Sequence, residues 1–271
     1  MSAFEAIVLG IVQGLTEFLP ISSTAHLRIV PAFAGWDDPG AAFTAVVQLG
    51  TMAAVLLYFR DDLWRILRTW FASLRDPALR SELDARMGWY IGLGTIPIAI
   101  FGFIFSDQIE SGGRDLYLIG VTLIVFGLIM AVADRLGRKQ RELRTLDARD
   151  ATAVGFAQAL ALVPGVSRSG ATITAGLFRG LTREAAARYS FLLSIPAVVL
   201  SGLFELRKLG GAGQPGAGAA VVATLLAFIV GYASIAFLLR YLARHSLLAF
   251  TAYRVGLGAL VLVLTAAGTI S

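Results

Sequence analysis

The chain has 271 residues, of which 57% are hydrophobic and 15% charged, and its formal net charge is +5. A soluble domain carries about 25% charged residues, so this composition excludes an ordinary water-soluble protein and favours a polytopic α-helical membrane protein. The sequence has no cysteine, which excludes disulfides and thiolate metal sites, and its two histidines leave little room for a histidine-rich metal cluster. The basic residues gather in a few loops, a pattern that suits a membrane better than a nucleic-acid partner.

The first apolar segment, Met1–Phe18, does not have the pattern of a cleavable signal peptide. It lacks a basic stretch at its start, and Glu5, Gln13 and Glu17 interrupt its apolar run. An ordinary first membrane span is one interpretation of this segment. The internal repeat described below favours a different one.

Six later segments are long enough to cross about 30 Å of hydrocarbon at about 1.5 Å per residue. Each is predominantly apolar, as a transmembrane helix requires. The six are Ala41–Phe59, Trp89–Phe105, Leu116–Ala133, Ala186–Phe204, Gly218–Leu239 and Leu247–Ala267.

The charge of the loops predicts how these spans are oriented. Arg60–Gly88 contains six arginines and Asp134–Asp150 contains six basic residues, whereas Ser106–Asp115 contains one. Because two spans separate the two basic loops, both loops lie on one side, and the positive-inside rule makes that side cytoplasmic.

Large apolar side chains recur at helical spacing within the first basic loop, while its arginines fall on other faces. This pattern predicts an amphipathic helix on the cytoplasmic membrane surface, with a plain connecting helix as the alternative. The apolar positions are Leu63, Trp64, Leu67, Trp70, Phe71 and Leu74.

Two shorter apolar segments, each interrupted by a proline, resemble one another. The first reads LGIVQGLTEFLPISST and the second VGFAQALALVPGVSRS. The matched pairs are Gly10 with Gly155, Gln13 with Gln158 and Leu15 with Leu160 at a separation of 145 residues, and Pro20 with Pro164 and Ser23 with Ser167 at 144. Three full spans follow each segment, and three is an odd number, so the second copy is expected to be inverted in the membrane.

We therefore expect an all-α polytopic membrane protein with an inverted-topology repeat in a single membrane domain, residues 1–271. Repeat 1 covers residues 1–133, a cytoplasmic linker covers 134–150, and repeat 2 covers 151–271. Each half begins with a re-entrant helix hairpin, Met1–Pro39 or Ala151–Arg183, and continues with three transmembrane helices. The first hairpin would enter from outside and the second from inside, which places both chain ends outside. Two ordinary spans with a chance similarity are the alternative.

The two proline-containing loops carry the polar residues of a site at the membrane midplane. Ionisable groups at that depth usually face a cavity and pair with one another, so Glu17 and Arg168 are expected partners. They form either a structural ion pair between the repeats or an anion site in which Arg168 binds phosphate oxygens. In an anion site, Glu17 would hold a divalent cation or act as an acid or base. Ser23 and His26 add a candidate nucleophile and a candidate proton carrier.

Three other polar residues have simpler interpretations. Gln48 lies in the middle of a span and either lines the same cavity or makes a buried hydrogen bond between helices. Arg254 is expected to extend to the membrane surface from the last span or to pair structurally, and His245 is expected to be solvated.

At the two loops the sequence resembles the undecaprenyl pyrophosphate phosphatase family of the bacitracin-resistance type. The first signature stands here as Gln13-Gly-Leu-Thr-Glu17-Phe-Leu-Pro20-Ile-Ser-Ser-Thr-Ala-His26, and the second as Pro164-Gly-Val-Ser-Arg-Ser-Gly-Ala-Thr172. The similarity extends along the whole chain, including QLG at 48–50 and FLLSIP at 191–196. Gln13 occupies the first acidic position of the family pattern, and Thr44 stands where many relatives have an acid, so fewer carboxylates are left to bind a metal.

The resemblance implies hydrolysis of undecaprenyl diphosphate to undecaprenyl phosphate and inorganic phosphate, with Mg²⁺ or Ca²⁺. This reaction would recycle the lipid carrier for cell-wall synthesis and confer bacitracin resistance. The resemblance also implies a site that opens to the outer side of the bacterial inner membrane. The expected catalytic residues are Glu17, Ser23, His26 and Arg168, with Glu17 also a metal ligand. The expected substrate-binding residues are Gln13, Ser22, Thr24, Gln48, Ser167, Ser169 and Thr172.

Two questions stay open at the level of the sequence. The nucleophile can be Ser23, His26 or water. A transporter or flippase for an isoprenoid lipid phosphate is the rival function, because inverted repeats with a midplane anion site are typical of transporters. Membrane lipids are the expected surroundings, and a homodimer is left open.

Overall fold

The computed structural model describes residues 1–105, 115–206 and 217–270, and there the chain forms helices and no β-sheet. The helices of the two proline-containing segments are α1 (Ala3–Phe18), α2 (Ser23–Ala34), α8 (Ala148–Ala159) and α9 (Arg168–Phe178). The others are α3 (Gly40–Tyr58), α4 (Arg60–Arg75), α5 (Leu83–Ile104), α7 (Leu116–Leu136), α10 (Arg183–Leu206), α11 (Ala217–Leu242) and α12 (Leu248–Ala266). Short 3₁₀ turns cover Pro77–Ser81, Leu143–Thr145 and Leu160–Leu162.

Among the described residues, four helices are long and apolar enough to cross a membrane, namely α5, α7, α11 and α12. They correspond to four of the six predicted spans. The span predicted at Ala41–Phe59 meets the condition only together with α4, from which it is bent by 69°. The span predicted at Ala186–Phe204 lies in α10, whose first two turns contain the charged residues Arg183, Glu184 and Arg188, and as a span it remains a prediction. The chain is therefore a polytopic α-helical membrane protein.

Both proline-containing segments are helix–break–helix units, as the sequence predicts. In the first, α1 ends at Phe18 and α2 begins at Ser23. Pro20 lies in the break, because a proline has no N–H to continue the hydrogen-bonding pattern of a helix. In the second, Pro164 occupies the corresponding break before α9.

The two halves of the chain pack on each other in a reciprocal way. Helix α1 of the first half packs against α11 of the second, and α8 of the second half packs against α5 of the first. At Gly10 an added Cβ would lie 2.5 Å from the carbonyl oxygen of Ala223, and at Gly155 it would lie 2.6 Å from the Cα of Gly94. Small residues allow such close helix contacts, so the matched glycines serve the same purpose. The inversion of the repeat across the membrane remains a prediction.

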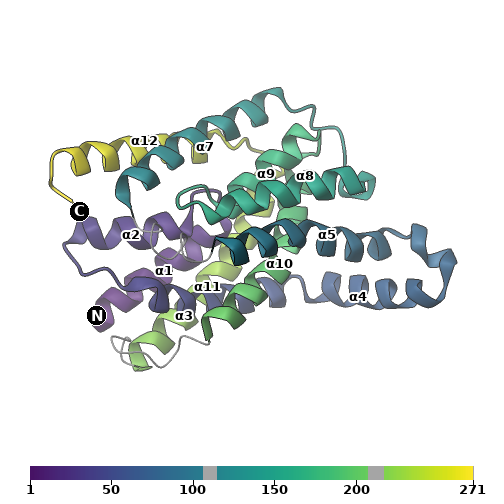
Figure 1. Cartoon of the computed structure of the whole chain (residues 1–271), viewed down its shortest axis with the longest axis horizontal. Helices are drawn as coiled ribbons and strands as arrows, with labels where there is room; N and C mark the ends of the chain where they lie inside the picture. Colours follow the sequence, from purple (N-terminus) through teal and green to yellow (C-terminus); the bar gives the residue numbers. More distant parts are fainter. Residues whose placement is uncertain (106–114, 207–216, 271) are drawn as a thin grey trace.

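The long axis of the molecule separates the chain ends from the basic loops. Both termini lie at one end, while the turn between α4 and α5 lies at the other (Figure 1). Helices α7 and α12 lie side by side along this axis (Figure 1). That both termini lie on one side of the membrane remains a prediction.

Helix α4 is the predicted amphipathic helix of the first basic loop. It packs along α5, where the Trp70 ring lies 5.4 Å from the Trp89 ring. Its large apolar residues Trp64, Leu67 and Phe71 are exposed. The location of this face on the membrane surface remains a prediction.

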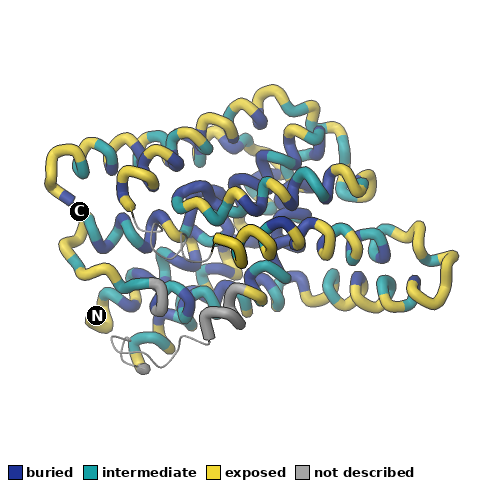
Figure 2. The backbone as a smooth tube through the Cα atoms, in the orientation of Figure 1, coloured by how far each residue is buried: buried dark blue, intermediate teal, exposed yellow. Residues whose placement is uncertain are grey.

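The end of α1 packs into the buried core through Phe18. The rings of Phe18 and Phe191 are 5.6 Å apart in an edge-to-face contact, and Phe59 lies 6.1 Å from Phe191. The outer faces of the long helices remain exposed (Figure 2) and carry large apolar side chains such as Phe103, Ile229 and Val263. Apolar surface of this extent is what lipid-facing helices require.

Candidate active site

The two breaks end in the same unusual backbone conformation. Ser22, which precedes α2, has φ 75° and ψ 102°, and Ser167, which precedes α9, has φ 72° and ψ 116°. Residues other than glycine adopt positive φ rarely and at an energetic cost. Each serine turns the chain so that a short helix starts at the next residue, Ser23 or Arg168.

Those two first residues meet at a single carboxylate. The hydroxyl of Ser23 donates to Oε2 of Glu17 at 2.6 Å, and Nη2 of Arg168 donates to Oε1 of the same residue at 2.5 Å. Gln13, one turn earlier in α1, donates its side-chain N–H to Oε2 at 3.1 Å. The Glu17 and Arg168 side chains are 8% and 16% exposed. The predicted pairing of Glu17 with Arg168 is therefore present, and Ser23 joins it.

This geometry supplies the elements of an activated-nucleophile site. A serine hydroxyl bonded to a carboxylate can transfer its proton as it attacks. The guanidinium has five N–H donors, so a single bond to Glu17 leaves others for phosphate oxygens. The N-termini of α2 and α9, which begin at Ser23 and Arg168, add the partial positive charge that favours a bound anion.

Arg254 of α12 connects the two breaks through hydrogen bonds to the backbone of both. Its guanidinium donates to the carbonyl oxygens of Pro20 at 3.1 Å, Val166 at 3.1 Å and Gly165 at 2.9 Å. It is fully buried. Of the two alternatives expected for Arg254, extension to the membrane surface is wrong and a structural pairing is confirmed. The carbonyls of the two breaks have no helical partner, and the guanidinium supplies the donors that they need. The sequence feature that could have indicated this buried role is the position of an ionisable residue inside a span.

His26 is held by two hydrogen bonds. Its Nδ1 lies 2.7 Å from the carbonyl oxygen of Ser22, and its Nε2 lies 2.7 Å from the hydroxyl of Tyr253. A carbonyl only accepts, so Nδ1 carries a proton, and in the neutral form of the ring Nε2 accepts from Tyr253. The two rings are nearly parallel, with centroids 5.6 Å apart. Tyr253 was not singled out from the sequence, where a tyrosine near the start of the last span carries no distinguishing pattern.

The other predicted binding residues divide into two groups. In each loop a pair of hydroxyls lies 3.2 Å apart, and these pairs are Ser22 with Thr24 and Ser167 with Ser169. Ser169 also donates to the carbonyl oxygen of Leu19 at 3.1 Å, which ties the second loop to the first.

Thr172 and Gln48 are placed differently. Thr172 is fully buried and its hydroxyl lies 2.6 Å from that of Ser190, so it connects α9 to α10. The Gln48 side chain makes no hydrogen bond within the described part of the chain, although its carbonyl accepts from Thr51, which in turn lies 3.5 Å from the amide nitrogen of Gln13.

Few protein atoms near Glu17 can hold a metal ion. No group of three or more histidines, cysteines or acidic residues is close enough together within the described residues. The Oε1 atom of Gln13 is buried and has no hydrogen-bond partner. Together with the Glu17 carboxylate, this amide oxygen fits a hard cation, such as Mg²⁺, that takes its remaining ligands from a phosphate and from water.

Comparisons with known proteins show the family to which the chain belongs. Residues 6–260 match the family described as bacitracin resistance protein BacA. Over 271 residues the chain is 56% identical to an undecaprenyl-diphosphatase of Thermobifida fusca, covering 100% of this chain and 93% of the relative. It is 56% identical over 268 residues to an undecaprenyl-diphosphatase of a Nocardioides species, covering 98% of each. It is 55% identical over 289 residues to undecaprenyl-diphosphatase 3 of Frankia alni, covering 100% of this chain and 97% of the relative. The chain belongs to the bacitracin resistance protein BacA family.

Proposed function

We propose that this membrane protein hydrolyses undecaprenyl diphosphate to undecaprenyl phosphate and inorganic phosphate. The observation that carries the proposal is the convergence of Ser23 and Arg168 on the two oxygens of Glu17. The relatives of similar length bear the name of this activity, so the transporter alternative is not favoured. Hydrolysis would recycle the lipid carrier for cell-wall synthesis and confer resistance to bacitracin.

In the proposed first step, Ser23 attacks the terminal phosphorus. Its proton passes to Oε2 of Glu17, 2.6 Å away, as the Oγ–P bond forms and the bond to the bridging oxygen breaks. Undecaprenyl phosphate leaves. Water then attacks the phosphoserine, Glu17 returns the proton to the serine oxygen, and inorganic phosphate leaves.

Arg168 binds the terminal phosphate during both steps. Phosphoryl transfer depends chiefly on positioning and on neutralising the charge of the equatorial oxygens. The guanidinium starts from the first turn of α9 and already touches Glu17. The phosphate is thereby held beside the serine that attacks it.

His26 is less suited to attack than Ser23. Its Nδ1 proton is donated to the carbonyl of Ser22, and the lone pair on Nε2 accepts a hydrogen bond from Tyr253. A nucleophilic nitrogen needs that lone pair. We assign His26 and Tyr253 to proton movement and positioning at the edge of the site.

A divalent cation, Mg²⁺ or Ca²⁺, fits this proposal as a partner of the diphosphate. Glu17 and Oε1 of Gln13 are the protein atoms that would hold it. When bound, such an ion neutralises phosphate charge. The phosphate oxygens would supply most of the other ligands.

We also propose that the site opens to the outer side of the bacterial inner membrane. The basic loops, which the positive-inside rule places in the cytoplasm, lie at the end of the molecule opposite the termini (Figure 1). The isoprenoid tail would remain in lipid while the diphosphate enters between the two breaks. Hydrolysis would then occur without the headgroup leaving the membrane.

Phosphate release by purified protein in detergent tests the proposed function. Hydrolysis needs no separate compartments, whereas transport does. The wild type should release inorganic phosphate from undecaprenyl diphosphate, and Glu17→Gln should be slower by about 10²-fold or more, the typical value of a general base. A folded wild-type protein that releases no phosphate, with or without Mg²⁺ or Ca²⁺, would contradict the proposal.

A further inference from the structure

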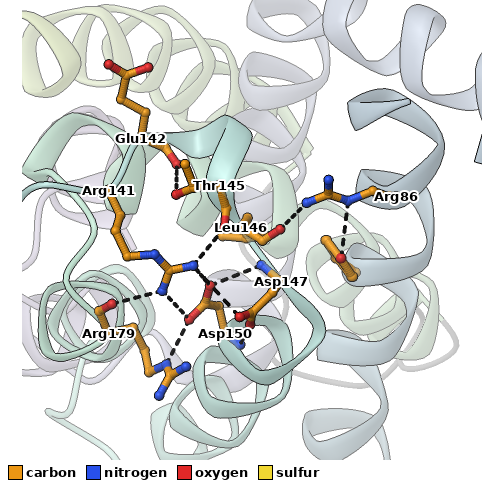
Figure 3. A network of polar contacts seen from close by, with 9 residues as sticks. Arg86, Arg141, Glu142, Thr145, Leu146, Asp147, Asp150 and Arg179 are labelled. Carbon is orange, nitrogen blue, oxygen red and sulfur yellow. Dashed lines mark hydrogen bonds and ion pairs between the residues drawn. The ribbon is translucent and has the colours of Figure 1, made fainter. Parts of the chain in front are cut away.

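A cluster of arginines lies where the linker after α7 meets the end of α9. Asp150 is fully buried at the start of α8 and accepts from Nη2 of Arg141 at 2.6 Å and from Nε of Arg179 at 2.8 Å (Figure 3). Burial alone would raise the pKa of Asp150, but the hydrogen bonds from the two arginines outweigh it and lower the pKa. Asp150 is therefore a carboxylate at neutral pH.

The linker is fixed in place by its backbone. The N–H groups of Gln140 and Arg141 donate to the carbonyl oxygen of Gly180 at 3.0 Å and 2.9 Å, and the N–H of Thr182 donates to the carbonyl oxygen of Arg141 at 2.9 Å. Nη1 of Arg141 donates to the carbonyl oxygen of Arg179 at 3.1 Å. The backbone carbonyls of this junction are thus already bonded, and the charge that faces outward comes from the arginines.

A cavity of about 460 Å³ opens at this junction. Its volume lies in the range of about 300–1,000 Å³ that is typical of ligand pockets. Arg138, Arg141 and Arg179 line it. Arg141 and Arg179 pair with Asp150, and Arg141 also lies 3.9 Å from a carboxylate oxygen of Asp147, so three positive charges stand against two negative charges. Arg138 is exposed and makes no ion pair or hydrogen bond within the described residues. The cavity therefore has a positive charge that the protein does not neutralise.

The same cavity has an apolar rim. Leu136, the last residue of α7, is 75% exposed, and Phe178, the last residue of α9, is 53% exposed; both line the cavity. Helix α7 is one of the spans that are apolar enough to cross the membrane. Basic pockets at the ends of such helices bind anionic lipid headgroups, and a soluble anion would gain nothing from the apolar rim.

We propose that this cavity binds an anionic phospholipid of the leaflet that faces the basic loops. The phosphate of the headgroup contacts Arg138, Arg141 and Arg179, and the acyl chains lie along Leu136 and Phe178. The site is separate from the Glu17 centre and does not depend on the proposed reaction. Its occupation stabilises the junction between the linker and the second half, because the ligand bridges the linker and the end of α9.

Titration of the whole protein in a neutral detergent with dioctanoylphosphatidylglycerol tests this site. The melting temperature should rise with the lipid. In Arg138→Gln about fivefold more lipid should be needed, the factor that corresponds to about 1 kcal/mol for one basic residue. Arg149→Gln is the matched control, because Arg149 is also exposed in this basic region and does not line the cavity. It should respond as the wild type does.

Two further ligands distinguish the source of the anion. Dioctanoylphosphatidylcholine tests the need for net charge, and inorganic phosphate tests the need for acyl chains; neither should reproduce the shift. Equal responses of Arg138→Gln and Arg149→Gln would overturn the proposal, since they would indicate diffuse attraction to the basic surface. Equal protection by inorganic phosphate would overturn the lipid assignment. The side-chain partners of Asp150 are kept in both variants, since Arg141 and Arg179, which pair with it, are unchanged.

Discussion

Ser22 and Ser167 lie 145 residues apart and share a left-handed backbone conformation, with φ 75° and 72°. Each directly precedes a short helix, and each shares a hydrogen bond with the hydroxyl two residues later, on Thr24 or Ser169. The equivalence makes Ser23 the counterpart of Arg168, and these are the two residues that reach Glu17. One repeated backbone turn thus positions the proposed nucleophile in the first half and the proposed phosphate-binding group in the second.

The strained conformation predicts an unusual order of stability at position 22. The Ser22 side chain makes no capping hydrogen bond to α2, so the backbone conformation dominates. Ser22→Gly should be more stable than Ser22→Ala by about 1 kcal/mol, because glycine adopts positive φ without a steric penalty. The thermal melting temperature of both variants in detergent measures this difference.

Ser234 in the interior of α11 provides the control, because there the order should reverse and glycine should be the less stable. An alanine variant at position 22 that melts above the glycine variant would contradict the conformation.

Arg254 should be needed for the stability of both breaks. Arg254→Met removes the donors to the carbonyls of Pro20, Gly165 and Val166, and each buried unpaired acceptor costs about 1–3 kcal/mol. We expect a loss of at least about 3 kcal/mol in the free energy of unfolding, together with a loss of phosphate release. Arg240→Met, at the exposed end of α11, should change stability by less than about 0.5 kcal/mol. Equal melting temperatures of the two variants would refute this role.

Arg168→Lys tests the planar guanidinium rather than the charge. A lysine keeps the positive charge but loses the fork that can bind phosphate and Glu17 at the same time. Loss of one charge-assisted hydrogen bond, about 1.5–3 kcal/mol, corresponds to a reduction in phosphate release of roughly 10- to 150-fold. Near-wild-type turnover would reduce Arg168 to a point charge or a structural partner.

Tyr253→Phe tests the hydrogen bond to His26 while keeping the ring. Loss of one neutral bond, about 0.5–1.5 kcal/mol, should lower kcat about 2- to 13-fold and should shift the pH profile of phosphate release. The melting temperature should change little, because the tyrosine is half-exposed. Tyr117→Phe serves as a matched control on an exposed tyrosine of α7. An unchanged kcat and pH profile would mean that Tyr253 only packs against His26.

The fold could be predicted from the sequence to the extent that it depends on hydrophobic length and periodicity. Four predicted spans correspond to α5, α7, α11 and α12, and both breaks lie at the predicted prolines. The prediction matched Ser23 with Ser167, whereas the backbone conformation matches Ser22 with Ser167. The alignment by residue type was off by one position, because Ser22 and Ser23 are both serines and only the backbone conformation distinguishes them.

The candidate site was predictable where it depends on charges at membrane depth and less so where it depends on backbone acceptors. Glu17 and Arg168 were expected to pair because isolated charges there are unfavourable. The partners of Arg254 are carbonyl groups, which every residue has, so the sequence gives no sign of them. Tyr253 contacts a histidine more than two hundred positions away, a distance that periodicity cannot bridge.

The most direct test is to trap the phosphate on Ser23. Purified protein would be mixed with undecaprenyl diphosphate that is radiolabelled at the terminal phosphorus, then quenched rapidly in acid, in which a phosphoserine survives. We predict acid-stable label on the peptide that contains Ser23, and neither label nor appreciable turnover in Ser23→Ala. If no acid-stable label forms and Ser23→Ala keeps about a tenth of wild-type activity, the loss expected for one neutral hydrogen bond, Ser23 does not attack, and water or His26 does.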